Sequence, residues 1–178
     1  MLRTEYNLVR RLKGEEEKRS VIEKGILLAT DGSLESEYAA REAIRIANGL
    51  GVELHVVNVA PVPSAYAAQG TLTVLDLVDP ELEGRLRGLA ERNARETLNE
   101  QVHKLEEGGG KVTKIHARIG RPDVEIVRLA EELEAGVVVV GDHGLGPFKR
   151  DALGSVSDSV VRHAPCPVLV VRRDQDYG

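Results

Sequence analysis

The chain has 178 residues, of which 42% are hydrophobic and 30% charged, and its formal net charge at pH 7 is -5. These proportions are typical of one soluble globular domain with extensions, and they exclude an intrinsically disordered chain. The negative charge and the scarcity of aromatic residues, at 3%, argue against nucleic-acid binding, which depends on cationic surfaces and stacking platforms.

Residues 1–24 carry many charges of both signs and are predicted to form an extension outside the core. From residue 25 onward, apolar runs of strand length alternate with segments whose apolar residues recur at helical spacing. Strands are predicted at 25–30, 52–59, 111–119, 136–141 and 167–171, and helices at 34–50, 122–133 and 155–163. A further, long helix is predicted between the segment 60–80 and the glycines at 108–110.

The long helix is expected to bury one face that runs from Leu86 through Leu89 and Asn93 to Leu105. The irregular segment 60–80 before it is predicted to be a flexible loop insertion that acts as a lid, because long irregular loops in compact domains tend to be functional or disordered.

Five alternations of strand and helix predict an α/β fold: a doubly wound, mostly parallel sheet with helices on both faces. The domain is expected to span residues 25–173, with a short tail at 174–178. Ligands of such sheets bind beyond the carboxyl ends of the strands.

The single cysteine, Cys166, lies next to the last predicted strand and excludes an intramolecular disulfide. We expect a buried, reduced thiol without a catalytic role, although His163 is three residues away. No run approaches the roughly 18 apolar residues of a membrane span, and no apolar secretory segment is evident. The sequence therefore predicts a cytoplasmic protein without membrane contact.

The segment after the fourth predicted strand contains the pattern G-x2-G-x9-G-S, formed by Gly141, Gly144, Gly154 and Ser155. Glycine lets the backbone approach a ligand closely, and a helix N-terminus offers unpaired N–H groups and a positive dipole to an anion. The pattern indicates a phosphate site, although strand-to-helix turns also use glycine for structural reasons.

The chain resembles the universal stress protein family over about residues 25–172. The resemblance is carried by ATDGS at 29–33, HVVNVAP at 55–61, ARIGRP at 117–122 and the segment 141–171, which ends in HAPCPVLVV. It implies the adenine nucleotide alpha hydrolase-like fold, a five-stranded parallel sheet in the order 3-2-1-4-5. Strands 1 and 4 are then neighbours whose outgoing loops meet at the ligand crevice.

This family has a branch that binds ATP and a branch that does not. Retention of G-x2-G-x9-G-S implies the ATP-binding branch, with ATP, ADP or AMP as ligand and Mg²⁺ bound through the phosphates. Asp31 is expected to accept hydrogen bonds from adenine or ribose, with helix capping as its alternative role. Val59 is expected to form a wall for adenine, Gly141 to allow close passage of the ribose, and Gly144 to open the phosphate loop.

The start of the last helix supplies the remaining predicted ligands. The backbone amides of Gly154, Ser155, Val156 and Ser157 are expected to bind phosphate oxygens, and the two serine hydroxyls to add donors. The alternative role of either serine is the N-cap, which is compatible with phosphate contact. His143 is expected to donate to a phosphate.

Three nearby side chains modify this expectation. Asp142 replaces the small hydroxyl residue common at its position in the family and should repel phosphate unless Mg²⁺ mediates or the side chain turns to solvent. Lys149 and Arg150 either neutralise the outer phosphates or are simply solvated.

The histidines show no metal-ligand spacing, so no protein-held metal is expected.

No Walker A sequence is present, and no residue stands out as a base that activates water. The sequence therefore predicts an ATP-binding, nucleotide-responsive stress regulator with no assigned catalytic residue and at most slow hydrolysis. It is expected to form a homodimer through its C-terminal edge strand and to act on regulatory protein partners that the sequence does not identify. Three alternatives are an interaction module that binds no nucleotide, an ATP pyrophosphatase and a response-regulator receiver.

Overall fold

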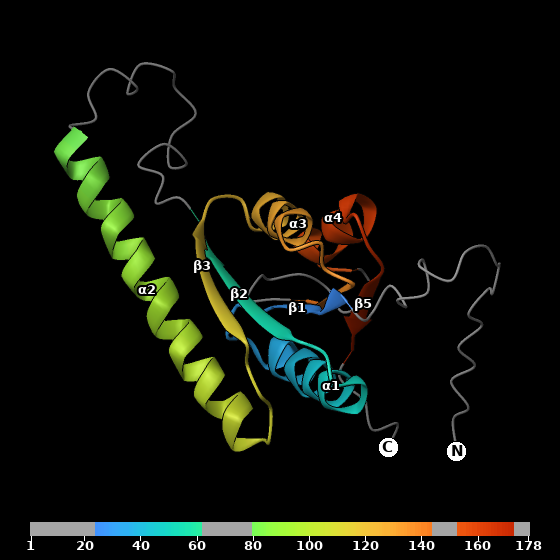
Figure 1. The fold of residues 1–178 in the computed structure, drawn as a ribbon. Coiled ribbons are helices and arrows are strands. Elements are labelled where there is room, and N and C mark those ends of the chain that lie inside the picture. The colour runs from blue at the N-terminus through green and yellow to red at the C-terminus, as the bar shows by residue number, and fades with distance from the viewer. Residues whose placement is uncertain (1–23, 62–79, 144–152, 173–178) are drawn as a thin grey trace, which may run out of the picture.

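The computed structural model describes residues 24–61, 80–143 and 153–172 (Figure 1). The strands are β1 (Ile26–Ala29), β2 (Leu54–Ala60), β3 (Lys114–Ile119), β4 (Val137–Gly141) and β5 (Val168–Val171), and the helices are α1 (Leu34–Leu50), α2 (Pro80–Glu107), α3 (Pro122–Glu132) and α4 (Ser155–His163). The predicted extension, the predicted tail, nearly all of the predicted lid, and Gly144, Lys149 and Arg150 lie outside the described residues.

The five strands form one parallel sheet in the order β3-β2-β1-β4-β5, which confirms the predicted fold. Strand β1 lies at the centre, where Ile26 is paired with Leu54 of β2 on one side and with Val137 of β4 on the other. The run of four valines in β4 is buried throughout, as expected for a parallel strand covered on both faces. The connections that leave β1 and β4 therefore start side by side.

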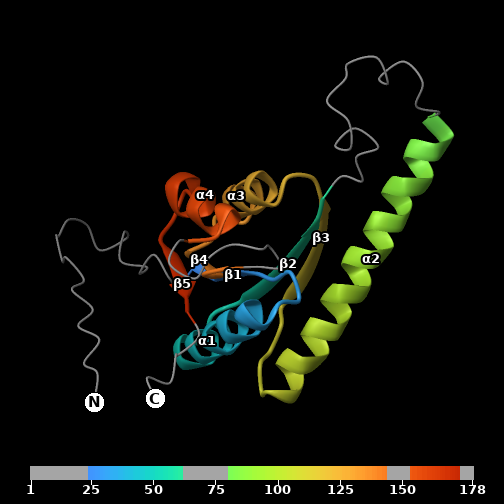
Figure 2. The same cartoon turned by 180° about the vertical axis from the view of Figure 1, so that it is seen from behind.

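Helices α1 and α2 cover one face of the sheet, and α3 and α4 cover the other (Figures 1 and 2). The alternation within β1 explains this three-layer arrangement. Ile26 and Leu28 belong to the core on the α1 side, whereas Leu27 belongs to the core on the α3 side. All three side chains are almost completely buried, and burial of each contributes about 1.5–3 kcal/mol to folding.

Helix α1 begins as its sequence predicts. The hydroxyl of Ser33, the N-cap residue, accepts a hydrogen bond from the backbone N–H of Ser36 at 3.2 Å. Glu35 and Glu37 lie in the first turn, where carboxylates interact favourably with the helix dipole. The helix ends at Gly51, whose φ of 66° lies in the left-handed region.

Helix α2 is much longer than the strand that it covers. Its 28 residues span about 42 Å, whereas the six residues of β3 span about 20 Å. Ala94, Leu98 and Leu105 are buried, but Leu89 is 49% exposed and Asn93 is exposed too. The predicted face is therefore interrupted at Leu89 and Asn93, although Ala90 between them is buried, in the part of the helix that extends past the sheet (Figure 1).

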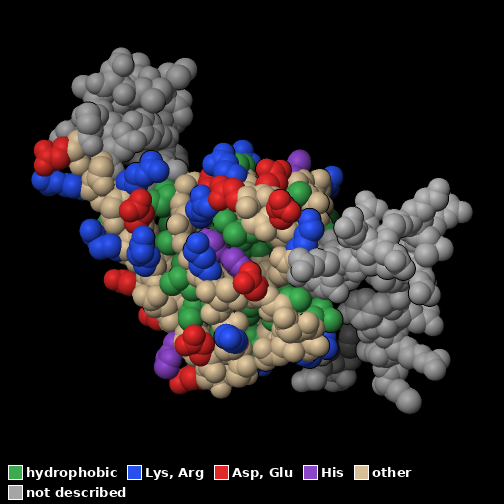
Figure 3. All heavy atoms as spheres, viewed as in Figure 1, with side chains coloured by type: hydrophobic (Ala, Val, Ile, Leu, Met, Phe, Trp, Pro, Cys, Tyr) green, Lys and Arg blue, Asp and Glu red, His purple; other side chains and the backbone are tan. Residues whose placement is uncertain are grey.

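The surface of α2 carries Arg and Lys side chains intermixed with Glu (Figure 3). This pattern is typical of a solvated helix face.

Among the described helices, none is both long enough and apolar enough to cross a membrane.

Cys166 lies in the turn before β5 and is half-buried, whereas a buried thiol was predicted. The reason is that β5 is the last strand of the described sheet, so the residues around it are covered less completely than those of β4. Burial raises the pKa of the Cys166 thiol, so the protonated, unreactive form prevails at neutral pH.

Candidate functional site

A pocket of about 240 Å³ lies where β1, β2 and β4 end and where α4 begins. Of the nine residues predicted to bind nucleotide, eight line this pocket: Asp31, Val59, Gly141, His143, Gly154, Ser155, Val156 and Ser157. The ninth, Gly144, lies outside the described residues. Four segments that are distant in the sequence thus meet at the crevice expected for an open α/β sheet.

The pocket has an apolar side and a polar side. Val57 and Val59 of β2 and Pro122 and Ile126 of α3 supply apolar side chains. The turn after β1 and the first residues of α4 supply carboxylate, hydroxyl and backbone groups. Such a site suits a ligand that has one flat apolar part and one anionic part.

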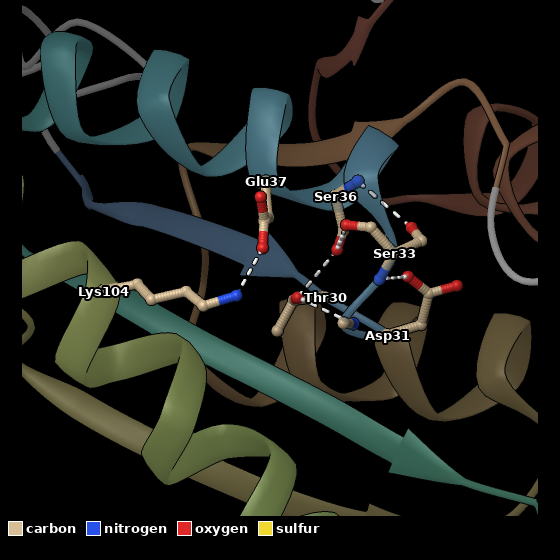
Figure 4. Close-up of polar contacts among 7 residues, drawn as sticks. Thr30, Asp31, Ser33, Ser36, Glu37 and Lys104 are labelled. Atoms are coloured by element: carbon tan, nitrogen blue, oxygen red, sulfur yellow. Dashed lines mark hydrogen bonds and ion pairs between the residues drawn. The ribbon is translucent and has the colours of Figure 1, made fainter.

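The turn between β1 and α1 is fixed by its own hydrogen bonds (Figure 4). Thr30 donates to the Ser36 hydroxyl at 3.0 Å, and this hydroxyl donates to the carbonyl of Ser33 at 2.8 Å. The buried amide of Asn58 donates to the Thr30 carbonyl at 2.8 Å and ties the turn to β2. The backbone at this end of β1 is therefore held in place by protein groups.

Asp31 lies in this turn and lines the pocket half-buried. Its Oδ1 accepts a hydrogen bond from the backbone N–H of Ser33 at 3.0 Å (Figure 4). Helix capping, the alternative role of Asp31, is thus only partly observed. Asp31 stabilises the turn that leads into α1, while Ser33 is the N-cap itself.

The N-terminus of α4 supplies backbone donors to the pocket. Gly154 is the N-cap, so the interpretation of Ser155 or Ser157 as the cap is wrong. The Gly154 N–H donates to the Asp142 carbonyl at 2.8 Å, and a Cβ at Gly154 would lie 3.0 Å from that oxygen. The N–H groups of the first three helical residues have no acceptor within a helix, which leaves them available to an anion.

The two serines of this helix differ in their surroundings. The Ser157 hydroxyl is buried and donates to the Gly141 carbonyl at 2.7 Å, so it is used inside the protein. Ser155 is exposed at the pocket. A Cβ at Gly141 would lie 3.0 Å from the backbone carbon of Glu35, so close packing against α1 requires glycine at this position.

Asp142 and His143 follow β4 directly and are 14% and 15% exposed. Asp142 Oδ2 lies 3.2 Å from His143 Nδ1 and 3.7 Å from Nε of Arg172. The Asp142 carboxylate therefore does not point to solvent. It faces two nitrogen-bearing side chains, those of His143 and Arg172. The buried Nε2 of His143 has no hydrogen-bond partner among the residues that the structure describes.

Sequence reasoning did not assign several pocket residues. They are Ala29, Thr30, Ser36, Val57, Pro122, Ile126 and Val140. The spacing of two sets of residues could have indicated the pocket. Pro122 and Ile126 lie four residues apart on one face of α3, and Val57 shares a strand face with Val59. Within the described ranges, no three His, Cys, Asp or Glu side chains are grouped so as to hold a metal ion.

The model of the universal stress protein family matches residues 24–172. The chain belongs to this family. A protein of Staphylococcus aureus strain USA300 that bears the family's name is 34% identical over 153 residues, which cover 85% of this chain and 86% of that protein.

Solved structures agree with this assignment. The universal stress protein UspA from Lactobacillus plantarum has a TM-score of 0.66 at 25% identity, over 83% of this chain and 96% of that one. A universal stress protein from Archaeoglobus fulgidus, solved in complex with dAMP, has a TM-score of 0.55 at 25% identity, over 84% and 98% of the two chains.

Proposed function

We propose that this chain binds an adenine nucleotide in the pocket and acts as a nucleotide-responsive stress regulator. The observation that carries the proposal is the convergence of eight predicted residues, from four separate segments, on one pocket beside a helix N-terminus. The dAMP complex of the Archaeoglobus fulgidus relative supports adenine nucleotides as the ligand class. ATP, ADP and AMP are the candidates.

The two sides of the pocket give the orientation of the ligand. Adenine lies against the apolar side formed by Val59 and Ile126, where Asp31 accepts a hydrogen bond from the base or the ribose. The phosphates lie at the start of α4, where the backbone N–H groups of Ser155 to Ser157 have no acceptor within the helix. Mg²⁺ would be bound through the phosphates.

Hydrolysis is expected to be slow at most. Phosphoryl transfer requires a placed nucleophile, metal and charge together. No residue is assigned as the base that activates water, and the Asp31 carboxylate already accepts a hydrogen bond from the Ser33 N–H. A nucleotide in this site would therefore act chiefly as a bound signal.

The edge of the sheet supports a homodimer. The residues of β5 are all half-buried, and β4 pairs with β5 along one side. A second copy placed along the other side would satisfy the backbone groups of this edge. Sedimentation equilibrium of the full chain tests this: a dimer mass supports the proposal, and a monomer mass at high concentration contradicts it.

The decisive experiment is to denature freshly purified protein and identify any released nucleotide by chromatography. Calorimetric titration of stripped protein with ATP, ADP and AMP gives the affinity of each. We expect stoichiometric binding of at least one nucleotide, with turnover far slower than binding. Neither released nucleotide nor heat of binding would overturn the proposal and favour an interaction module, and rapid release of pyrophosphate would favour an ATP pyrophosphatase.

A further inference from the structure

His143 Nε2 is the one buried side-chain nitrogen or oxygen without a hydrogen-bond partner in the described part of the chain. A polar group that is buried and unpaired destabilises the folded state, so natural structures rarely contain one without a reason. Because His143 also lines the pocket, the unpaired nitrogen is explained if a ligand completes its hydrogen bonding.

The other ring nitrogen of His143 determines what Nε2 can do. Nδ1 lies 3.2 Å from Asp142 Oδ2, and a carboxylate accepts hydrogen bonds, so the proton of the ring resides on Nδ1. Nε2 of the neutral ring is then an acceptor, and it becomes a donor only when the ring takes up a second proton.

The position of His143 favours an anionic partner. Its Cα lies 3.3 Å from where a Cβ of Gly154 would stand, so the residue borders the N-cap of α4. Helix N-termini attract anions. A phosphate oxygen accepts hydrogen bonds at neutral pH, so a contact with Nε2 requires the protonated ring.

Charged residues lie on the elements that meet at this end of the sheet. They are Asp142 after β4, Arg172 after β5, Asp31 after β1, Glu35 in the first turn of α1, and Asp158 in the first turn of α4. Asp158 is paired with Arg162 at 2.9 Å, and Asp31 with the N–H of Ser33. Asp142 is the carboxylate in contact with the His143 ring.

We propose that Asp142 is a positioning residue that holds His143 through Nδ1, so that the protonated ring donates Nε2–H to a phosphate oxygen of the bound nucleotide. This inference rests on the proposed function and adds to it that nucleotide binding takes up a proton. Acidification from pH 8 to pH 6 therefore strengthens binding, and the Asp142 carboxylate, which differs from the usual family residue, supports the charge of the ring.

The test measures AMP binding by calorimetry in several buffers of different ionisation enthalpy, which gives the number of protons taken up. The wild-type chain is expected to take up a proton on binding AMP and to bind about fivefold more tightly at pH 6 than at pH 8. His143→Gln and Asp142→Asn should each lose this proton uptake. At pH 6 each should bind AMP about tenfold more weakly than the wild-type chain.

Two controls separate the possible causes. Asp158→Asn removes the same charge near α4 without touching His143, and it should keep the proton uptake of the wild type. Adenosine has no phosphate, so its affinity should be equal in all variants and independent of pH. The AMP phosphate itself titrates at about pH 6 and also contributes to the measured proton uptake. The pH profile of AMP binding to His143→Gln measures this contribution alone.

Each other outcome has a definite meaning. If the wild-type chain binds no adenine nucleotide at any pH, the proposed function itself fails. If it binds AMP but both variants keep its proton uptake, the role of Asp142 and His143 is wrong and the proposed function stands. If Asp142→Asn also loses adenosine binding, Asp142 is a structural residue of the pocket, and the positioning role is contradicted.

Discussion

Two histidine environments at opposite ends of the sheet contrast sharply. At the carboxyl ends of the strands, His143 contacts Asp142 through Nδ1 while its buried Nε2 has no partner among the described residues. Toward the amino ends of β2 and β3, His55 Nδ1 and His116 Nε2 lie 3.0 Å apart as a hydrogen-bonded pair, and Glu53 lies 3.4 Å from the other nitrogen of His55.

The difference separates the proposed ligand site from a structural contact. The His55–His116 pair joins two strands, and the two ring nitrogens that face each other are partners within the protein. His143 and the first amides of α4 present hydrogen-bonding capacity that the described protein does not use. Unsatisfied polar groups beside a cavity therefore indicate function here, and three experiments test that distinction.

The largest expected effect is the loss of nucleotide binding in Gly154→Val. Its side chain would displace the Asp142 carbonyl or shift the start of α4, since a Cβ would already lie 3.0 Å from that oxygen. We expect AMP affinity to fall by roughly 100-fold while the circular dichroism spectrum is retained. Gly49→Ala is the control, because a Cβ at Gly49 has no neighbour within 4 Å. A folded Gly154→Val chain with wild-type affinity would remove the phosphate site from α4.

The next effect concerns stability and the His55–His116 pair. Burial, together with the nearby charges of His55, Lys114 and Arg118, lowers the pKa of His116 to about 4. The unfolded chain has the ordinary value near 6.5, so between these two values the unfolded state binds more protons and stability falls as the pH falls. Because the ring is partly exposed, solvent screening reduces the loss to about 1–2 kcal/mol.

Urea unfolding at pH 7 and pH 5 measures this loss. His116→Gln should show a smaller difference between the two pH values than the wild-type chain, whereas His103→Gln, on the exposed surface of α2, should match the wild type. Equal pH dependence in the wild-type chain and His116→Gln would show that the pair does not carry the effect.

The smallest effect distinguishes two serines within the pocket. Ser157 donates its hydroxyl to the Gly141 carbonyl, so Ser157→Ala should lower the unfolding free energy by about 1 kcal/mol and change AMP affinity less than twofold. Ser155 is exposed, so Ser155→Ala should leave stability unchanged and weaken binding a few-fold. Urea unfolding and calorimetry measure both quantities. The reverse pattern would mean that a satisfied hydroxyl still contacts the ligand.

Most of the fold follows from local patterns in the sequence. The predicted helix 155–163 has the observed limits, and the predicted strands differ by one to three residues at their ends. Strand ends are less certain because an apolar run continues into the turn without a change of periodicity. The overhang of α2 was not predicted, because helical periodicity does not report the length of the strand beneath.

The site was predictable where backbone chemistry determines the residue type. Gly154 and Gly141 must be glycine because other backbone atoms approach them closely, and this requirement is visible as a motif. Pro122 and Ile126 were missed because an apolar pocket wall has the same pattern as an ordinary core face. The contacts of Asp142 with Arg172 and of His55 with His116 join residues far apart in sequence, so only the strand order brings them together.

The overhang of α2 implies a gradient of local opening along one helix. Its second half is anchored by Leu98 and Leu105 in the core, whereas around Leu89 the helix has fewer buried side chains to hold it. Amide protons near Leu89 should therefore exchange with solvent through local fraying, while those near Leu98 should exchange only when the whole domain unfolds. A single helix thus spans nearly the full range of protection factors of the molecule.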